Sequence, residues 1–440
     1  MSLTASPNAD QAKAEDEFVD FLLSPTEREM RLIGPGGTGK SWTVKRLITQ
    51  ALKIYQQNCE VLGLEPEYTN YILTALTNKA AQALQDETGL EVTTIHSWLG
   101  LTVKPNFTTG AQDLKRSANW TIREKYLIFI DEVYMTDSKL YAELQASTMG
   151  CKFVYIGDDK QLDPVGEGVS PIRNLNVRTA ELTIPVRNAG SQALKDLCQL
   201  LRDNVAGCVD EAEKGIPWTW PMLPLTPGEV DHVKDEYELA ALLAGPFLQP
   251  TGTNLITAFS NQRVNDYNNH MRLLRGQTIM FEKGETLISN DLYERGRFRI
   301  RNEQTVEIVE AADTLHPLGL GELVVPVQYV KILGYPDQQI PAIIDRDFHR
   351  DAMRWAAKEK DWPTYYALKN DFADFRPRDA CTVHKSQGST KDVVLVDLNN
   401  IGTCNFTVMT ARMLYVAVSR ARHRVIFYGN LPAKYGGLIL

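Results

Sequence analysis

The sequence lacks paired cysteines, and this argues against two classes of protein. The 440 residues include six scattered cysteines, which form no Cys-x-x-Cys pair and lie beside no histidine cluster. Zinc ribbons and secreted disulfide frameworks depend on such spacings. The cysteine content therefore argues against both and favours a reducing compartment.

Long apolar runs and a leader-like start are missing as well. The longest apolar stretch, residues 239–248, contains Gly245 and Pro246 and is shorter than the roughly 20 residues of a membrane-spanning helix. Residues 1–7 have neither the basic nor the apolar region of a signal peptide. We therefore expect a cytoplasmic protein with no membrane partner.

An excess of positive charge is also absent. The chain has 47 Lys and Arg against 55 Asp and Glu, which gives a formal net charge of −8. This balance argues against a protein that coats nucleic acid by bulk charge, but it is compatible with an enzyme that has a local basic channel. Three short basic clusters lie at residues 272–275, 295–301 and 420–424, and each alone is equally typical of a solvated surface.

The composition itself is that of a large globular protein. Hydrophobic residues make up 43% and charged residues 23% of the chain, and both values are ordinary. At about 150 residues per domain the length corresponds to two to four domains. In the first third, short β-branched runs alternate with helical stretches, which predicts a parallel α/β sheet. The expected strands are 31–33, 71–74, 126–130 and 153–156, and the expected helices are 40–57, 78–87 and 138–147.

Two segments break this alternation. Residues 97–122 are polar, carry Pro105 and Gly110, and are expected to form a small insertion in the first domain. A strand at 254–259 and a helix at 262–274 follow, but from 276 to 345 glycines punctuate short runs such as 305–309 and 324–332. That spacing predicts a small β-barrel module. The α/β pattern returns with strands at 393–396 and 424–428.

Residues 34–41 match the phosphate-binding pattern G-x-x-x-x-G-K-[S/T] in full. Glycines let backbone N–H groups close around phosphates at the positive end of the following helix. Lys40 would contact the β- and γ-phosphates and Ser41 would offer a hydroxyl to Mg²⁺. A chance glycine turn of this pattern is expected in roughly 1–2% of chains of this length. The candidate nucleotide-binding residues are Gly36, Gly37, Thr38, Gly39, Lys40 and Ser41.

An acidic pair follows the apolar run 127–130. Asp131 would lie beside the metal and Glu132 would polarise the attacking water. Alone, an apolar run followed by two acids is common, but downstream of a complete phosphate-binding loop it favours hydrolysis of a Mg²⁺-bound nucleoside triphosphate.

Seven segments together resemble the motifs of superfamily 1 helicases. They are residues 74–81, 94–97, 131–132, 157–165, 182–187, 382–389 and 415–422. Their order and spacing are similar to those of the B subtype, the phage Dda-like and bacterial RecD-like enzymes, and the size and short first insertion most resemble the Dda-like ones. The resemblance implies two RecA-like parallel-sheet motor domains, with two insertions that the motifs do not cover.

The domain division implied by the resemblance has four parts. Residues 1–96 and 123–183 would form the first RecA-like domain, and residues 97–122 a β-hairpin pin inserted in it. Residues 184–275 and 376–440 would form the second RecA-like domain, and residues 276–375 an SH3-like β-barrel inserted in that one.

The resemblance also implies roles for individual residues. Lys40, Asp131, Glu132, Gln161, Arg187 and Arg420 would be catalytic, with Gln161 sensing the γ-phosphate and the two arginines contacting the phosphates. Gln11 would read the adenine edge, and Gly388 would belong to the nucleotide site. The nucleic-acid contacts would be Thr77, His96, Thr382, His384 and Lys385, with Phe107 as the candidate tip of the pin and Leu114 as its competitor. A buried structural role remains the alternative for His96.

The function implied by the resemblance is that of an ATP- and Mg²⁺-dependent DNA helicase, moving 5′→3′ on single-stranded DNA. Its partners would be single strands, duplex junctions and single-strand-binding or replication proteins, and it would act as a monomer in replication or recombination, in the host cytoplasm for a phage protein. Two alternatives stay open: an NTPase that remodels protein–nucleic acid complexes without unwinding, and an RNA-directed helicase. Four residues depart from the family pattern: Leu76 and Asp163 where proline is usual, Tyr134 where a small residue is usual, and Ser419 where threonine is commoner.

Overall fold

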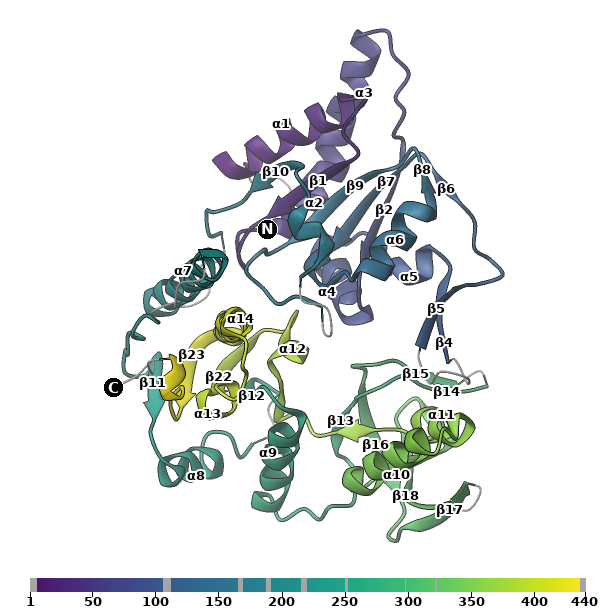
Figure 1. Ribbon diagram of the computed structural model, residues 1–440, viewed down its shortest axis with the longest axis vertical. Coiled ribbons are helices and arrows are strands. Elements are labelled where there is room, and N and C mark those ends of the chain that lie inside the picture. The colour runs from purple at the N-terminus through teal and green to yellow at the C-terminus, as the bar shows by residue number, and fades with distance from the viewer. Residues whose placement is uncertain are drawn as a thin grey trace. The chain divides into compact units, whose positions relative to one another are not determined.

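The computed structural model describes residues 6–105, 112–164, 169–186, 191–214, 220–249, 252–296, 298–320 and 323–435. The chain divides into two compact units: residues 1–103 with 114–190, and residues 104–113 with 191–440. Each unit contains a parallel β-sheet with helices packed on it (Figure 1). The α/β class with two parallel sheets is therefore confirmed.

The sheet of the first unit has the strand order β10-β1-β9-β7-β2-β3, and all neighbouring strands are parallel. All four expected strands are present, and β3 and β10 extend the sheet at its two edges. The bounds are β1 (Glu29–Ile33), β2 (Asn70–Ala75), β3 (Val92–Thr94), β7 (Tyr126–Asp131), β9 (Lys152–Gly157) and β10 (Arg178–Glu181). A separate short parallel pair joins β6 (Arg123–Glu124) to β8 (Thr148–Met149).

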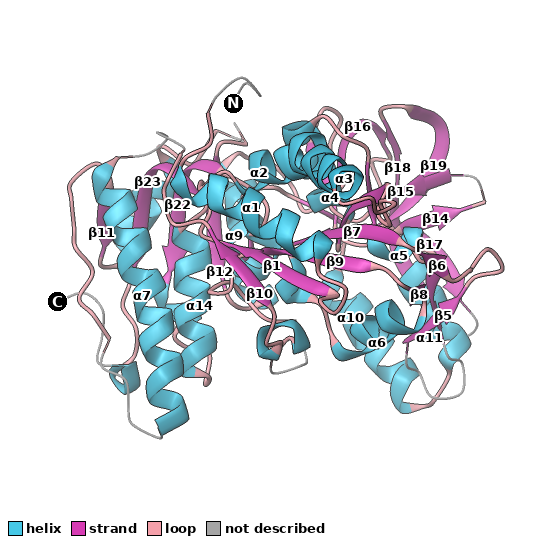
Figure 2. Cartoon of the chain, turned by 90° about the horizontal axis from the view of Figure 1, so that it is seen from above, coloured by secondary structure: helices cyan, strands magenta, loops and turns pink. Residues whose placement is uncertain are grey.

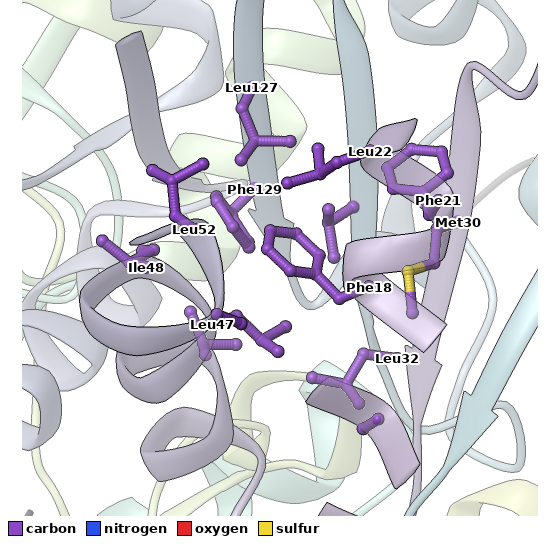
Figure 3. Packing of buried hydrophobic residues seen from close by; sticks show 14 of the residues in the cluster. Phe18, Phe21, Leu22, Met30, Leu32, Leu47, Ile48, Leu52, Leu127 and Phe129 are labelled. Atoms are coloured by element: carbon purple, nitrogen blue, oxygen red, sulfur yellow. The ribbon is translucent and has the colours of Figure 1, made fainter. Parts of the chain in front are cut away.

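Helices cover both faces of this sheet, because successive strand residues point to opposite sides. Phe129 packs against Phe18 of α1 with ring centroids 5.9 Å apart (Figure 3), whereas Ile128 and Ile130 pack on the other face with Leu140 of α6. The helical segments are α1 (Ala9–Leu23), α2 (Lys40–Arg46), the π-helical turn η1 (Leu47–Ala51), α3 (Leu52–Val61), α4 (Asn78–Thr88), α5 (Ile95–Trp98), α6 (Ser138–Ala146) and the 3-10 turns η2 (Val133–Met135) and η3 (Pro171–Asn174). The continuous run from α2 to α3 confirms the helix expected at 40–57.

The polar insertion contains a two-stranded sheet of β4 (Leu101–Pro105) and β5 (Gln112–Arg116). Phe107, the expected tip residue, lies outside the described residues. Leu114, its competitor, packs against the apolar cluster of the first unit that contains Ile95 and Leu99. Leu114 is therefore a packing residue and no candidate for the tip.

The parallel sheet of the second unit has the order β11-β23-β22-β12-β21. Helices α8 and α9 pack on one face. Helices α7 and α14 lie side by side and contact β23 and β22 (Figure 2). The strands are β11 (Val230–Val233), β12 (Asn254–Ala258), β21 (Ala380–Thr382), β22 (Lys391–Asp397) and β23 (Ala421–Tyr428); the helices are α7 (Gln192–Lys214), α8 (Glu236–Ala244), α9 (Asn261–Leu274), α12 (Val383–Ser386), α13 (Leu398–Ile401), α14 (Thr407–Val418) and the 3-10 turn η4 (Ala433–Tyr435).

The glycine-punctuated segment forms an antiparallel sheet of order β17-β18-β16-β13-β20, with β19 paired to β18. Its strands are β13 (Thr286–Ser289), β16 (Thr305–Ala311), β17 (His316–Leu320), β18 (Leu323–Ile332), β19 (Tyr335–Ile343) and β20 (Phe375–Arg376), beside the hairpin β14 (Tyr293–Arg295) and β15 (Phe298–Ile300). Helices α10 (Arg346–Lys358) and α11 (Trp362–Asn370) pack against it. A separate β module is therefore present, and its SH3-like character stays a prediction.

Several arginines of the basic clusters form ion pairs. Arg272 pairs with Glu285 and Arg275 with Asp379, and Arg424 pairs with Asp231 at 2.6 Å. In the described part of the chain, no helix has both the length and the apolar character required to cross a bilayer.

Candidate nucleotide site and nucleic-acid contacts

The motif residues of the first unit follow the strands of one parallel sheet. The phosphate-binding loop follows β1, Asp131 ends β7, and Gln161 follows β9. The strand register pairs Ile33 with Gly157, and Ala75 with Asp131. Because parallel strands end at the same edge, these segments meet at the carboxyl edge of the sheet, where open α/β sheets bind ligands.

The phosphate-binding loop has the backbone conformation that its glycines were expected to provide. Gly37 and Gly39 have φ values of +87° and +83°, and Gly39 stands at the N-cap of α2. A Cβ atom at Gly34 would lie 2.3 Å from the Leu182 carbonyl oxygen, so no larger residue fits there. The Lys40 ammonium donates to the Gly34 and Pro35 carbonyls at 2.7 and 3.0 Å. The lysine ammonium therefore lies against the first two residues of the phosphate-binding loop.

Gln11 is bound to this loop. Its side chain is buried, and its amide Nε2 donates to the Thr38 carbonyl at 3.3 Å. The amide Oε1 accepts from the Asn8 N–H at 3.1 Å, while the Asn8 side chain accepts from the Gln11 N–H, and together they form a capping box at the start of α1. The start of α1 and the loop are thus one connected structure.

The neighbouring Asp10 holds the segment that follows β10. Its Oδ2 accepts from the Thr183 N–H, the Thr183 hydroxyl and the Ile184 N–H at 2.7, 2.8 and 3.0 Å. The Thr183 N–H contributes most to a lowered pKa of Asp10. The Val186 N–H donates to the Gly37 carbonyl at 2.9 Å, so this segment lies on the phosphate-binding loop as far as Val186. Arg187, the next residue, lies outside the described ones.

The acidic pair lies at the end of β7. Burial, together with the Glu132 charge, raises the pKa of Asp131, while Lys40 opposes the rise. Glu132 has a left-handed backbone with φ of +53°, a conformation that carries strain in a non-glycine residue and clusters at functional sites.

Ser41 and Asp131 could hold a magnesium ion together with a nucleotide. The loop after β1 and the end of β7 flank β9 at one edge, and a hydroxyl and a carboxylate are the few protein oxygens that Mg²⁺ takes beside substrate phosphates. Across the described residues, no group of three or more His, Cys, Asp or Glu is arranged to bind a metal ion. The Ser41 hydroxyl and the Asp131 carboxylate are of the donor types that suit a metal held jointly with phosphates.

Gln161 lies in a tight turn after β9. Its N–H donates to the Asp158 carbonyl at 3.0 Å, and its amide Nε2 donates to the Asp158 carboxylate at 3.4 Å. Both side chains are buried. The turn thus keeps Gln161 at the same sheet edge as the phosphate-binding loop.

The expected nucleic-acid contacts of the first unit begin two helices. Thr77 is exposed and caps α4, accepting from the Ala80 N–H at 3.1 Å. His96 lies on α5 and is half-buried, and burial lowers its pKa. Burial thus favours the neutral form of this imidazole.

In the second unit Thr382 and Lys385 belong to one short helix. Thr382 caps α12 by accepting from the Lys385 N–H at 3.3 Å. The Lys385 ammonium contacts the carbonyl and side chain of Asn290 and lies 3.7 Å from the Glu303 carboxylate. The partly exposed lysine thus joins α12 to the antiparallel module. His384 beside it has a pKa lowered by burial.

Arg420 is largely buried at the end of α14. Its Nε donates to the Val416 carbonyl at 3.1 Å, and its Nη2 donates to the Ser419 hydroxyl at 2.7 Å. Ser419 therefore supplies a hydroxyl acceptor to Arg420, and the commoner threonine has the same group. The Arg420 carbonyl accepts from the Lys391 N–H at 2.8 Å, and Gly388, with φ of +70°, lies in the loop before β22.

Sequence reasoning missed three residues that hold these segments. Asp10 could have been found from its place beside Gln11 and from its acidic charge in the first turn of a helix. Arg173, which binds the turn around Gln161, and Asn290, which binds Lys385, gave no local signal because their partners lie in other elements.

Two known families match the chain. Residues 7–215 match the AAA domain family, and residues 379–428 match the UvrD-like helicase C-terminal domain family. The chain is 23% identical to the ATP-dependent DNA helicase dda of Enterobacteria phage T4, over 92% of this chain and 95% of that protein. It is 34% identical to the ATP-dependent RecD2 DNA helicase of Deinococcus radiodurans, over 38% of this chain and 20% of that protein.

Solved structures with a similar course of the chain include Pif1 helicases. The Candida albicans Pif1 helicase covers 99% of this chain at a TM-score of 0.41 and 15% identity, with 97% of that chain covered. A Pif1 helicase solved for its unwinding of forked duplex DNA covers 99% of this chain at a TM-score of 0.47 and 15% identity, with 94% of that chain covered.

Proposed function

The chain belongs to superfamily 1 of the helicases, in the B subtype with Dda and RecD, and from this premise we propose that it is an ATP-dependent DNA helicase. The observation that carries the proposal is the meeting, at one sheet edge, of a complete phosphate-binding loop, the Asp131–Glu132 pair and the buried Gln161 turn. Kinases or transporters with phosphate-binding loops have no need of the further motifs that this chain carries.

The nucleotide is proposed to be ATP, taken up with Mg²⁺. Backbone N–H groups from Gly36 to Gly39 bind the phosphates at the positive end of α2, and the Lys40 ammonium turns from its loop carbonyls to the β- and γ-phosphates. Ser41 and Asp131 hold the metal, which supplies charge neutralisation on the phosphates. Gln11, whose amide is bound to the Thr38 carbonyl within the loop, recognises the adenine edge.

Hydrolysis needs an activated water molecule, and it needs cations that stabilise the negative charge developing on the transferred phosphoryl group. Glu132 accepts the proton of the attacking water. Arg187 and Arg420 stabilise the charge that develops on the γ-phosphoryl oxygens, a role worth about 10³–10⁵ in rate for arginine fingers. Gln161 detects the γ-phosphate and passes its presence or loss to the nucleic-acid contacts.

Single-stranded DNA is the proposed track. Thr77 and the first turn of α4 offer hydroxyl and N–H groups to a phosphate, and Thr382, His384 and Lys385 supply contacts from the second unit. The direction, 5′→3′, is proposed from family membership alone. Residues 97–122, with Phe107 at the candidate tip, are proposed to split duplex junctions, and the chain to work as a monomer that meets single-strand-binding or replication proteins.

Strand displacement on tailed duplexes tests this proposal. Labelled duplexes carry a 5′ DNA tail, a 3′ DNA tail or a 5′ RNA tail, with ATP and Mg²⁺ present; only the 5′ DNA tail is expected to support unwinding. Lys40→Met is expected to abolish hydrolysis and unwinding, whereas Lys53→Met, at an exposed position on α3, is the matched control. Hydrolysis without strand separation would favour a remodelling NTPase, and unwinding from the RNA tail would favour an RNA-directed helicase.

A further inference from the structure

Arg173 binds the turn that carries Gln161 through three different groups. The residue lies on η3, and its side chain is 11% exposed. Its Nη1 donates to the Asp159 carbonyl, its Nη2 donates to the Gln161 carbonyl at 2.9 Å, and its Nε donates to the Asp163 carboxylate at 2.5 Å. The planar guanidinium thus holds the backbone at Asp159 and Gln161, on either side of Lys160, and the side chain of Asp163 at the end of the turn.

The same guanidinium packs on the element that follows the acidic pair. Its central carbon lies 4.5 Å from the ring centroid of Tyr134, which is buried in η2 directly after Glu132. A cation over an aromatic ring is attracted by the ring quadrupole, more strongly where water is excluded. Arg173 therefore connects two chain segments, the end of the acidic pair and the Gln161 turn.

Two of the departures from the family pattern meet at this arginine. Asp163 replaces a usual proline and Tyr134 replaces a usual small residue, and Arg173 contacts both. A proline would restrain the turn through its own ring. In this chain the restraint on the turn comes from contacts between separate elements. Ser170 contributes to it, because its N–H donates to the Asp163 carboxylate at 3.3 Å and its hydroxyl donates to the Thr136 carbonyl at 2.9 Å.

We propose that Arg173 is a positioning residue, which keeps Gln161 in register with the Asp131–Glu132 pair so that hydrolysis responds to bound DNA. The inference rests on the proposed function. As a positioning residue Arg173 contacts neither nucleotide nor DNA, and it acts through the backbone of residues 159–161 and through Tyr134. Loss of its three hydrogen bonds lets the turn move without changing the phosphate-binding loop.

The decisive variant is Arg173→Lys. A lysine keeps a positive charge for Asp163 but cannot donate to three groups in the geometry of a guanidinium fork. We expect the melting temperature to change little, KM for ATP to stay within about twofold, and the DNA-stimulated kcat to fall about tenfold, within the range of measured coupling between sites. Arg173→Met and Asp163→Asn are expected to lose the stimulation too, and the double variant to lose no more than Arg173→Met alone, because the residues act as one unit.

Arg178→Met is the matched control. Two nitrogens of Arg178 also donate to one carboxylate, that of Glu27, at 3.2 and 3.0 Å, but Arg178 is the first residue of β10 and so lies at the amino ends of the strands of the same sheet. It is expected to keep the full DNA response. Equal DNA stimulation of hydrolysis in Arg173→Lys and wild type would overturn the role proposed for Arg173 and leave the proposed helicase function standing. A wild-type chain without any DNA-stimulated hydrolysis would overturn the proposed function, and the inference with it.

Discussion

Asp10 and Thr183 are joined by two hydrogen bonds, from the Thr183 N–H at 2.7 Å and its hydroxyl at 2.8 Å, although 173 positions separate them in the chain. One end of this link is the first turn of α1, and the other is the segment leading to Arg187. Since Gln11, the next residue, binds Thr38 of the phosphate-binding loop, the start of α1 connects the nucleotide site to that segment.

Asp10→Ala removes the acceptor of three hydrogen bonds and is expected to lower the free energy of unfolding by about 1–2 kcal/mol. The lowered pKa of Asp10 means that its contribution is present above the ordinary carboxyl pKa and is lost as the pH falls through the folded-state value. Thermal unfolding of variant and wild type should therefore differ at pH 7 and converge at low pH. Asp16→Ala, at an exposed position on the same helix, is the control, and a gap that persists unchanged in acid would contradict the prediction.

Arg420→Ala is expected to abolish DNA-stimulated turnover, a loss of at least about 10³-fold, while ATP binding stays largely intact. The measurement is steady-state phosphate release beside titration with a fluorescent ATP analogue. Arg422→Ala, which removes only an exposed side chain 3.8 Å from Asp392, is expected to remain active. Near-normal turnover of Arg420→Ala would refute the role of this arginine.

Gln11→Ala is expected to reduce the preference for ATP over CTP. Gln11 also closes a capping box, so the variant should lose about 1 kcal/mol of stability as well. Nucleotide preference is the ratio of kcat/KM for the two triphosphates, measured well below the melting temperature. If the wild type uses CTP as well as ATP, Gln11 has no part in reading the base.

The predicted strands, and the motifs that follow them, came from local signals. Thr94 and Thr382 each end a strand, Thr77 lies two residues after one, and all three cap the next helix. A few neighbouring residues therefore indicate both the end of the strand and the capping hydroxyl. The phosphate-binding loop is equally local, because its glycines and Lys40 lie within eight positions of one another. The phosphate-binding loop and the acidic pair therefore stand at the ends of two strands that the sequence predicted.

The unpredicted parts depend on distant partners or lack periodicity. Helix α14 is buried on most sides, with Leu414 and Val416 both inaccessible, so it shows no polar face from which helical periodicity could be read. Arg173 lies ten positions from Asp163 and binds it only because η3 returns to the turn after β9. Such a contact depends on tertiary packing, and the spacing of the two residues in the sequence does not predict it.

Replacing residues 106–111 by two glycines is expected to spare hydrolysis stimulated by single-stranded DNA and to impair strand separation. The replacement leaves the paired strands β4 and β5 and the packed Leu114 in place, so the first unit should stay folded. Phosphate release and displacement of a 5′-tailed duplex are compared on the same preparation. Unwinding at the wild-type rate would show that this hairpin does not separate the strands.

Lys152→Met tests a buried charge on the sheet of the first unit. The Lys152 ammonium donates to the Phe21 and Ser24 carbonyls beneath α1, and burial, with a contribution from Arg28, lowers its pKa to about 8. Between this value and the ordinary lysine pKa of about 10.4, the unfolded chain binds more protons than the folded one. The folded protein is therefore expected to gain up to about 1.4 kcal/mol per pH unit from this group as the pH rises through that window.

The gain should be absent from Lys152→Met, so the stability of wild type relative to the variant is expected to rise between pH 8 and 10. Denaturant unfolding at several pH values measures it, with Lys53→Met as a control, because that exposed side chain keeps its surroundings on unfolding. Parallel pH profiles of wild type and Lys152→Met would mean that the buried ammonium keeps an ordinary affinity for its proton. The carbonyls of Phe21 and Ser24 would then offset the whole cost of burying the charge.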